Sequence, residues 1–202
     1  MKTVQKETIV IATKNTDKFR IVVDILLGLG GTGFTYCNLK DLGITEEMEE
    51  KGTIEERAKQ KVLFYKNFIL DTMTPRDVVS IIGVDDGIYI EKEGKGTAQS
   101  KEITDLILSD SYLHRGDTVI IQRSYFAYFP YSKKDFSIVT NIPLQFLGNP
   151  KGITRKEGSY PLSHVLGHIG TETTIVDNSK ESNIRYNVLH SKNLTPVFKH
   201  LH

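Results

Sequence analysis

Hydrophobic and polar positions near the start of the chain predict a strand, a turn and a helix. An apolar run from Ile9 to Ala12 precedes a polar turn, and hydrophobic residues then recur at helical spacing from Phe19 to Leu27. The turn carries Thr13, Asn15 and Lys18. Unpaired N–H groups at a helix start, together with a lysine, favour an anion such as phosphate. The alternative from this segment alone is an ordinary turn whose polar side chain caps the helix.

Further along, the pattern predicts a second helix and a buried central strand. An apolar stripe predicts a helix from Thr53 to Leu70, and the β-branched run from Val78 to Val84 is typical of a buried strand. This strand ends at Asp85-Asp86-Gly87, where the alternative is a simple turn. Other predicted elements are a short strand (Phe34 to Leu39), an acidic loop or irregular helix (Asp41 to Lys51), a helix (Ser100 to Asp110), a hairpin (Thr118 to Phe129 with Phe136 to Leu144), and C-terminal helices around Ile184 and, after Pro196, around Val197. We therefore expect an α/β protein with a mixed sheet.

Composition narrows the possible partners and the compartment. The 202 residues are 39% hydrophobic, which is enough for one sizeable core or two small lobes. Lys and Arg (26) nearly balance Asp and Glu (25), so bulk charge indicates neither a nucleic-acid nor a membrane partner, and any anion site must be local. The lone Cys37 excludes an internal disulfide, and no apolar run approaches the roughly 20 residues of a membrane helix. We expect a soluble cytoplasmic protein.

Two acidic pairs are candidates for chemistry. Glu55-Glu56 begins the second predicted helix, and Asp85-Asp86 follows the buried strand, where α/β sheets open their ligand crevice. Carboxylates brought together there would hold Mg²⁺ and orient an attacking water. The alternative for Glu56 is a capping box with Thr53, and the alternative for Lys61, a candidate phosphate contact, is a solvated surface lysine.

Three other patterns carry weaker signals. Gly28 to Gly33 matches G-x-G-x-x-G but follows a helix instead of preceding one, which favours a helix C-cap over a dinucleotide site. His164 and His168 have the spacing of one helical face, yet they lack the glutamate of H-E-x-x-H, which favours partly buried histidines over a zinc pair. Tyr160 lies in a predicted loop, where it is a candidate to stack on a base, and the alternative is an ordinary loop tyrosine.

Taken in order, these motifs resemble the inosine triphosphate pyrophosphatase family, whose members hydrolyse nonstandard purine nucleoside triphosphates. The resemblance spans nearly the whole chain. The matching segments are Thr13 to Lys18 for T-x-N-x-x-K, Thr53 to Lys61 for T-[FI]-x-E-N-A-x-x-K, Asp85 to Ile88 for D-[ST]-G-L, Gly158 to Tyr160 for a Gly-x-Tyr segment, and Arg185 for the S-H-R block.

The resemblance implies a fold and a reaction. The fold is a twisted mixed sheet in a two-lobed, single domain over residues 1–202, with the nucleotide in the cleft between the lobes. The reaction converts a nucleoside triphosphate and water to a nucleoside monophosphate and pyrophosphate and depends on Mg²⁺. Related proteins are commonly homodimers, so the resemblance implies a homodimer for this chain as well.

The resemblance also implies roles for individual residues. Asp85 would orient the water with Glu56 and Lys18 as catalytic partners, and the metal ligands would be Glu56, Asp85 and Asp86. The phosphates would be held by Asn15, Lys18 and Lys61. The remaining substrate-binding residues would be Thr13, Asp86, Tyr160 and Arg185.

Several positions depart from the family pattern, although its phosphate and metal half is retained far better than its base-recognition half. The departures are Ile21 for a glutamate, Arg57 for the asparagine after the metal-site glutamate, Val84 for an acidic residue, Pro161 where an aspartate precedes proline in the family block, and Ile184 for the histidine of S-H-R. The rival hypotheses are a nucleotide-binding protein with degenerate or absent catalysis and an interaction protein with a vestigial cleft. The retained Lys18, Glu56 and Asp85 favour the enzyme.

Overall fold

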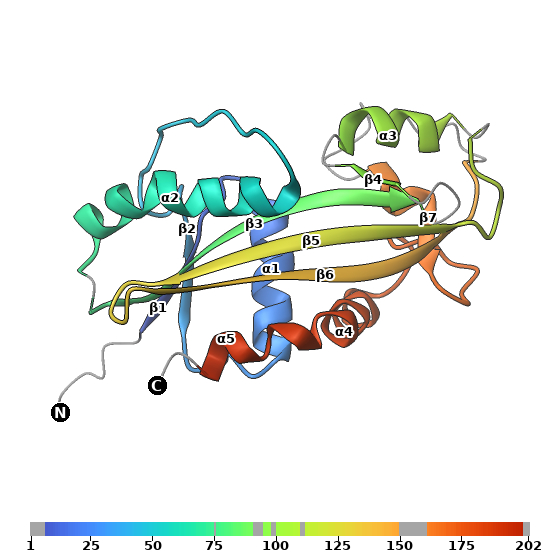
Figure 1. Ribbon diagram of the computed structural model, residues 1–202. Helices are drawn as coiled ribbons and strands as arrows, with labels where there is room; N and C mark the ends of the chain where they lie inside the picture. Colours follow the sequence, from blue (N-terminus) through green and yellow to red (C-terminus); the bar gives the residue numbers. More distant parts are fainter. Residues whose placement is uncertain are drawn as a thin grey trace. The chain divides into compact units, whose positions relative to one another are not determined.

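The computed structural model describes residues 7–74, 76–90, 95–97, 100–109, 112–149 and 161–199. Strands and helices alternate along the chain, as Figure 1 shows. The elements are β1 (Thr8–Ile11), α1 (Thr16–Gly28), β2 (Thr35–Asn38), α2 (Ile54–Thr72), β3 (Val78–Ile90), β4 (Lys95–Thr97), α3 (Ser100–Leu108), β5 (Thr118–Phe129), β6 (Lys134–Phe146), β7 (Leu166–His168), α4 (Lys180–His190) and α5 (Pro196–Lys199), with short 3-10 turns at Pro161–His164 and Lys192–Leu194. The predicted α/β class is confirmed.

Within the described residues, seven strands form one mixed sheet. The order is β2-β1-β3-β5-β6-β7, and β4 pairs with β3 off this path. Strand β1 is parallel to both β2 and β3, because helices α1 and α2 provide the crossovers that parallel pairing requires. Strand β4 is antiparallel to β3, and β7 is antiparallel to β6. The mixed sheet expected from the sequence is confirmed.

The chain groups into two compact units. Unit 1 contains Met1–Asp85, Ser124–Thr140 and Lys192–His202, and unit 2 contains Asp86–Arg123 and Asn141–Ser191. Strands β3, β5 and β6 each supply residues to both units. The single domain over residues 1–202 and the nucleotide cleft between lobes stay predictions.

Unit 1 has a hydrophobic core on each face of its strands. Successive side chains of a strand point to opposite faces, so Ile9 and Ile11 pack with α1 and α5, whereas Val10 and Ala12 pack with α2. Figure 1 shows α2 on one side of these strands and α1 on the other. Both faces of β1 are therefore covered, which explains its continuous apolar sequence.

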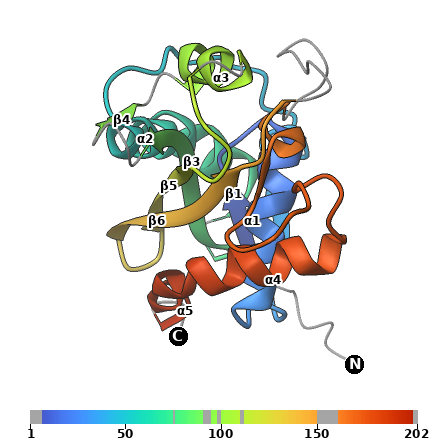
Figure 2. The same cartoon turned by 90° about the vertical axis from the view of Figure 1, so that its right-hand side faces the viewer.

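Unit 2 has a core of its own. Ile107 of α3 packs against Val119 of β5 and Leu144 of β6 in one buried cluster. Helix α4 has no buried residue, but Tyr186 packs against this cluster and donates a hydrogen bond from its hydroxyl to the Pro143 carbonyl at 2.6 Å. Figure 2 shows α3 and α4 on opposite sides of the strands of this unit.

Several details differ from the sequence-based expectations. Strand β3 runs through Asp85-Asp86-Gly87, so no turn forms there. His164 lies in a 3-10 turn and His168 in β7, so they do not share a helical face; Gly167 lies between them in β7, where a Cβ would meet the Thr173 carbonyl at 2.5 Å. Strand β5 has aromatic residues on both faces of the sheet.

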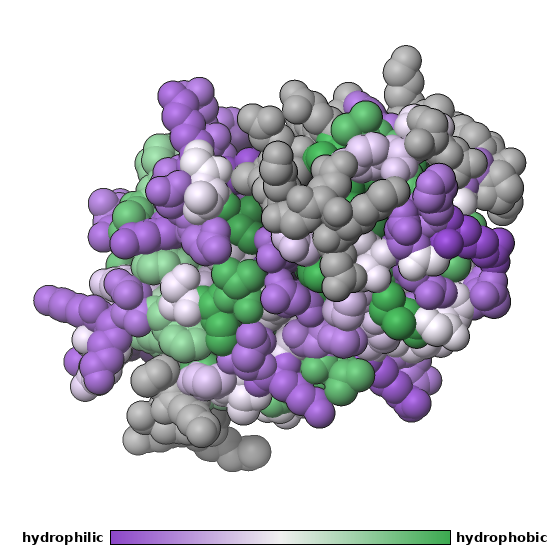
Figure 3. Space-filling view, turned by 45° about the vertical axis from the view of Figure 1, so that its right-hand side comes forward, coloured by the Kyte–Doolittle hydropathy of each residue, from purple (hydrophilic) through white to green (hydrophobic). Residues whose placement is uncertain are grey.

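In the described part of the chain, the large hydrophobic side chains that are exposed are Leu27, Leu63, Phe64, Leu106, Tyr131, Ile169, Val176 and Leu189. Figure 3 shows hydrophobic residues in separate groups among hydrophilic ones on the face it presents, the usual state of a protein surface. Among the described residues, the helices are too short or too polar to cross a bilayer.

Candidate active site around Asp85

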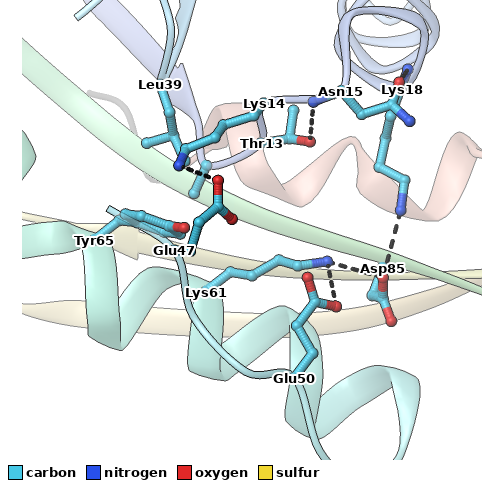
Figure 4. A pocket seen from close by; sticks show the side chains of 11 residues that line it. Thr13, Lys14, Asn15, Lys18, Leu39, Glu47, Glu50, Lys61, Tyr65 and Asp85 are labelled. Carbon is cyan, nitrogen blue, oxygen red and sulfur yellow. Dashed lines mark hydrogen bonds and ion pairs between the residues drawn. The ribbon is translucent and has the colours of Figure 1, made fainter. Parts of the chain in front are cut away.

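The N-terminus of α1 provides one wall of the candidate site. Asn15 is the N-cap residue, and its side chain accepts a hydrogen bond from the Lys18 backbone N–H at 2.9 Å. The Asn15 N–H in turn donates to the hydroxyl of Thr13 at 3.2 Å. The capping role that the sequence offered as an alternative for this turn is confirmed for Asn15. The cap fixes the turn and leaves the Lys18 side chain pointing away from it (Figure 4).

Helix α2 provides the opposite wall. The Thr53 N–H donates to the Glu56 carboxylate at 2.8 Å, and the Glu56 N–H donates to the Thr53 hydroxyl at 3.2 Å, which completes the capping box. Arg57 and Lys61 are four residues apart and share one face of the helix. Gly83 of β3 lets α2 approach closely, because a Cβ there would lie 2.0 Å from the Ala58 carbonyl oxygen.

The two helices and β3 bring three cations onto one buried carboxylate. Asp85 Oδ1 contacts Lys61 Nζ at 2.8 Å and Lys18 Nζ at 3.4 Å. The guanidinium of Arg57 engages Oδ2 through Nε at 2.5 Å and through Nη2. Lys61 Nζ also donates to the Val84 carbonyl at 3.0 Å. The Asp85 side chain is only 5% exposed, so these cations stand in place of water around its carboxylate.

A pocket of about 310 Å³ opens above Asp85. Its lining residues are Ala12, Thr13, Lys14, Asn15, Lys18, Leu39, Glu47, Glu50, Lys61, Tyr65 and Asp85. In Figure 4, Lys18 from α1 and Lys61 from α2 point toward Asp85 from different directions. The pocket lies just beyond the carboxyl end of β1, the edge at which α/β sheets bind ligands.

The segment between β2 and α2 contributes two carboxylates to this pocket. Glu47 pairs with Lys14 at 2.8 Å, and Glu50 pairs with Lys61 at 3.0 Å and with Arg57 at 4.0 Å. Lys14 also donates to two backbone carbonyls of the same segment. Sequence reasoning missed Lys14, Glu47 and Glu50; the only signal was an acidic run without a recognised motif.

Tyr65 holds this acidic segment through a hydrogen bond. Its hydroxyl donates a hydrogen bond to the Glu46 carbonyl at 2.9 Å. Burial, followed by the negative charges of Glu47, Glu50 and Glu46, raises the pKa of Tyr65. The hydroxyl therefore stays protonated and remains a donor at neutral pH.

Solved structures of two other proteins have the same architecture. One is a nucleoside-triphosphatase, or dITP/XTP pyrophosphatase, from Mycobacterium abscessus, with 15% identity, a TM-score of 0.55, and coverage of 95% of this chain and 97% of that one. The other is a HAM1 protein from Coxiella burnetii, with 11% identity, a TM-score of 0.63, and coverage of 96% and 98%. The chain has an inosine triphosphate pyrophosphatase-like fold. No protein-family model and no curated protein matches the sequence itself.

Within this inosine triphosphate pyrophosphatase-like fold, the structure gathers five of the site residues inferred from the motifs. They are Thr13, Asn15, Lys18, Lys61 and Asp85. All five line one pocket within unit 1, although they come from segments far apart in the sequence.

Other residues from the motifs lie elsewhere. Glu56 is exposed and closes the capping box. Asp86 pairs with Arg123 at 2.6 Å, and Arg185 is exposed and pairs with Glu181 one helical turn away on α4. Tyr160 is outside the described residues. The roles that the resemblance implies for these residues stay predictions.

The side chains around Asp85 do not fit a magnesium ion held by the protein. In the described part of the chain, no three His, Cys, Asp or Glu residues are grouped so as to hold a metal. Both oxygens of Asp85 contact cationic groups, whereas Mg²⁺ requires oxygen ligands at about 2.0–2.1 Å. Magnesium dependence stays a prediction, since this ion is commonly bound in part by substrate phosphates.

Proposed function

We propose that this protein is a nucleoside triphosphate pyrophosphatase and that Asp85 lies at its reaction centre. The observation that carries the proposal is the convergence of Lys18, Arg57 and Lys61 on one buried carboxylate at the floor of a pocket. Such an arrangement attracts a polyanion and also holds a carboxylate beside it. The pyrophosphatase name of the Mycobacterium abscessus neighbour supports the same reaction class.

The chemistry follows from charge and position. The oxygen of a water forms a bond to the α-phosphorus of the substrate, and the bond from that phosphorus to the bridging oxygen breaks. Pyrophosphate leaves, and the proton of the water passes to Asp85. Lys18 and Lys61 lie where they would offset the negative charge that grows on the leaving phosphates, so positioning and electrostatics supply the rate enhancement.

The substrates we propose are nonstandard purine nucleoside triphosphates. The support is the name of the Mycobacterium abscessus neighbour, which specifies dITP and XTP. The resemblance in the sequence leads to the same class. A cytoplasmic location and a homodimer belong to this proposal as well, and light scattering of the purified protein would test the dimer.

A substrate panel tests the reaction. The purified protein is incubated with ITP, dITP, XTP and the standard nucleoside triphosphates, with and without Mg²⁺, and pyrophosphate is measured. We expect Asp85→Asn to lower the rate by about 100-fold or more, because the acceptor for the proton of the water is lost. Asp71→Asn, an exposed position of α2, is the matched control and should keep the full rate. Pyrophosphate release that survives Asp85→Asn would contradict the proposal.

A second function is a nucleotide-binding protein without turnover. The observation that favours it is the engagement of both Asp85 oxygens by cations, because the lone pairs that would accept a proton from water are already occupied. Binding of the same nucleotides by calorimetry, without any release of pyrophosphate, would select this alternative.

A further inference from the structure

Positive charge exceeds negative charge at the pocket by one. Among the described residues, the ion pairs here join four cations, Lys14, Lys18, Arg57 and Lys61, to three carboxylates, Glu47, Glu50 and Asp85. A triphosphate carries several negative charges of its own. To bind it, the pocket must either gain positive charge or have some of its carboxylates move out into solvent.

The three carboxylates differ in how readily they can move out of the pocket. Asp85 is 5% exposed and held by three cations, whereas the side chains of Glu47 and Glu50 are 82% and 34% exposed. Exposed ion pairs contribute little free energy, so water can replace Lys14 as the partner of Glu47 at small cost. When both glutamates turn outward, four cations face a single carboxylate, and the pocket gains the charge that a polyphosphate needs.

Arg57 supplies positive charge to the Asp85 carboxylate, as a bound divalent cation would. Its planar guanidinium presents two donors, Nε and Nη2, to Oδ2, which neutralises the carboxylate and holds it in place. Lys18 and Lys61, which contact the other oxygen, are flexible point charges that can turn toward a phosphate. The donor set around Asp85 thus suits an anion better than a metal ion.

We propose that this pocket binds the polyphosphate chain directly, without a divalent cation, on Lys14, Lys18 and Lys61. Glu47 pairs with Lys14 and Glu50 pairs with Lys61 until the phosphates displace these glutamates, and Arg57 positions and neutralises Asp85. The inference rests on the proposed function, because it assigns the triphosphate of the substrate to this pocket, but it concerns binding and not turnover.

Calorimetric titration with inorganic tripolyphosphate in EDTA tests the inference. We expect the wild-type protein to bind, and we expect Glu50→Gln to bind about two- to fivefold more tightly, because a competing carboxylate is removed. Glu49→Gln, on the same segment and paired only with exposed Lys51 among the contacts described, is the matched control and should leave the affinity unchanged.

The role of Arg57 has its own test. Arg57→Gln should weaken tripolyphosphate binding about tenfold in EDTA, because the charge of Asp85 then opposes the phosphates. Arg57→Lys should restore part of the affinity, whereas Arg20→Gln, an exposed position of α1, should have no effect. Circular dichroism would show whether each variant is folded. Equal loss in Arg57→Gln and Arg57→Lys, with both variants folded, would identify a structural role and contradict the assignment.

The outcomes separate this inference from the proposed function. Tripolyphosphate that binds only after Mg²⁺ is added would overturn the inference and leave the pyrophosphatase proposal intact. Binding of Mn²⁺ alone, measured by electron paramagnetic resonance and lost in Asp85→Asn, would also overturn it. Nucleotides that bind in EDTA and are never hydrolysed would instead refute the pyrophosphatase proposal and support the inference.

Discussion

Asp85 and Asp86 are consecutive residues of β3, and their carboxylates have different surroundings. Asp85, in unit 1, contacts two lysines and an arginine and lines a pocket. Asp86, in unit 2, pairs with Arg123, whose side chain is 3% exposed. Neighbouring side chains of a strand point to opposite faces, so these two adjacent aspartates meet different neighbours. A buried ion pair alone is weak evidence of function, whereas several cations around one carboxylate in a pocket point to an anion.

The largest effect on stability should come from the ion pair in unit 2. Asp86→Asn should lower the free energy of unfolding by about 3 kcal/mol, because the guanidinium of Arg123 stays buried after losing a charged partner. Urea denaturation measures this change, and Asp135→Asn, an exposed position of β6, serves as the control. If Asp86→Asn lowers the free energy of unfolding no more than the control does, the ion pair between Asp86 and Arg123 does not stabilise the protein.

A smaller loss of stability should come from Gly83 in unit 1. Gly83→Ala should cost about 1–3 kcal/mol, because the added Cβ would overlap the Ala58 carbonyl and push α2 away from β3. The same displacement should weaken tripolyphosphate binding, since Lys61 lies on α2. Gly33→Ala is the matched control, because its Cβ would meet no atom within 4 Å. Unchanged denaturation of Gly83→Ala would show that the close approach of α2 is unimportant.

The smallest effect should be a pH dependence located in unit 2. His168 stacks on Tyr186 with ring centroids 3.9 Å apart, and burial lowers its pKa from the ordinary value of 6.5. The unfolded chain takes up this proton at a higher pH than the folded protein, so the free energy of unfolding should fall as the pH drops below 6.5.

Thermal unfolding from about pH 7.5 to about pH 5.5 measures this dependence. The decline in melting temperature should be shallower for His168→Gln than for the wild-type protein. His114→Gln, an exposed position, should follow the wild-type protein. Equal slopes for all three proteins would show that His168 does not contribute.

Local sequence signals predicted much of the fold and part of the site. The capping of α1 by Asn15 and of α2 by Thr53 and Glu56 depends on residues three apart, so the motif shows it directly. The alternative of a turn at Asp85-Asp86-Gly87 was wrong, because pairing within the sheet overrides the local preference of Asp and Gly.

The positions of Glu47 and Glu50 were not predictable in the same way. Their segment has no regular secondary structure, and its placement depends on Lys14 and Tyr65, which are distant in sequence. Arg57 was recognised as a departure from the family pattern, but its contact with Asp85 depends on the packing of α2 against β3. Tertiary contacts of this kind leave no periodic signal in a single sequence.

A crystal structure with an α,β-methylene nucleoside triphosphate, grown in EDTA, would show whether the pocket at Asp85 holds the phosphates without a metal ion. We expect phosphate oxygens within hydrogen-bonding distance of Lys18 and Lys61, with Asp85 still held by Arg57 and with Glu47 and Glu50 turned toward solvent. A triphosphate bound away from this pocket, with the ion pairs of Asp85 and both glutamates unchanged, would contradict this expectation.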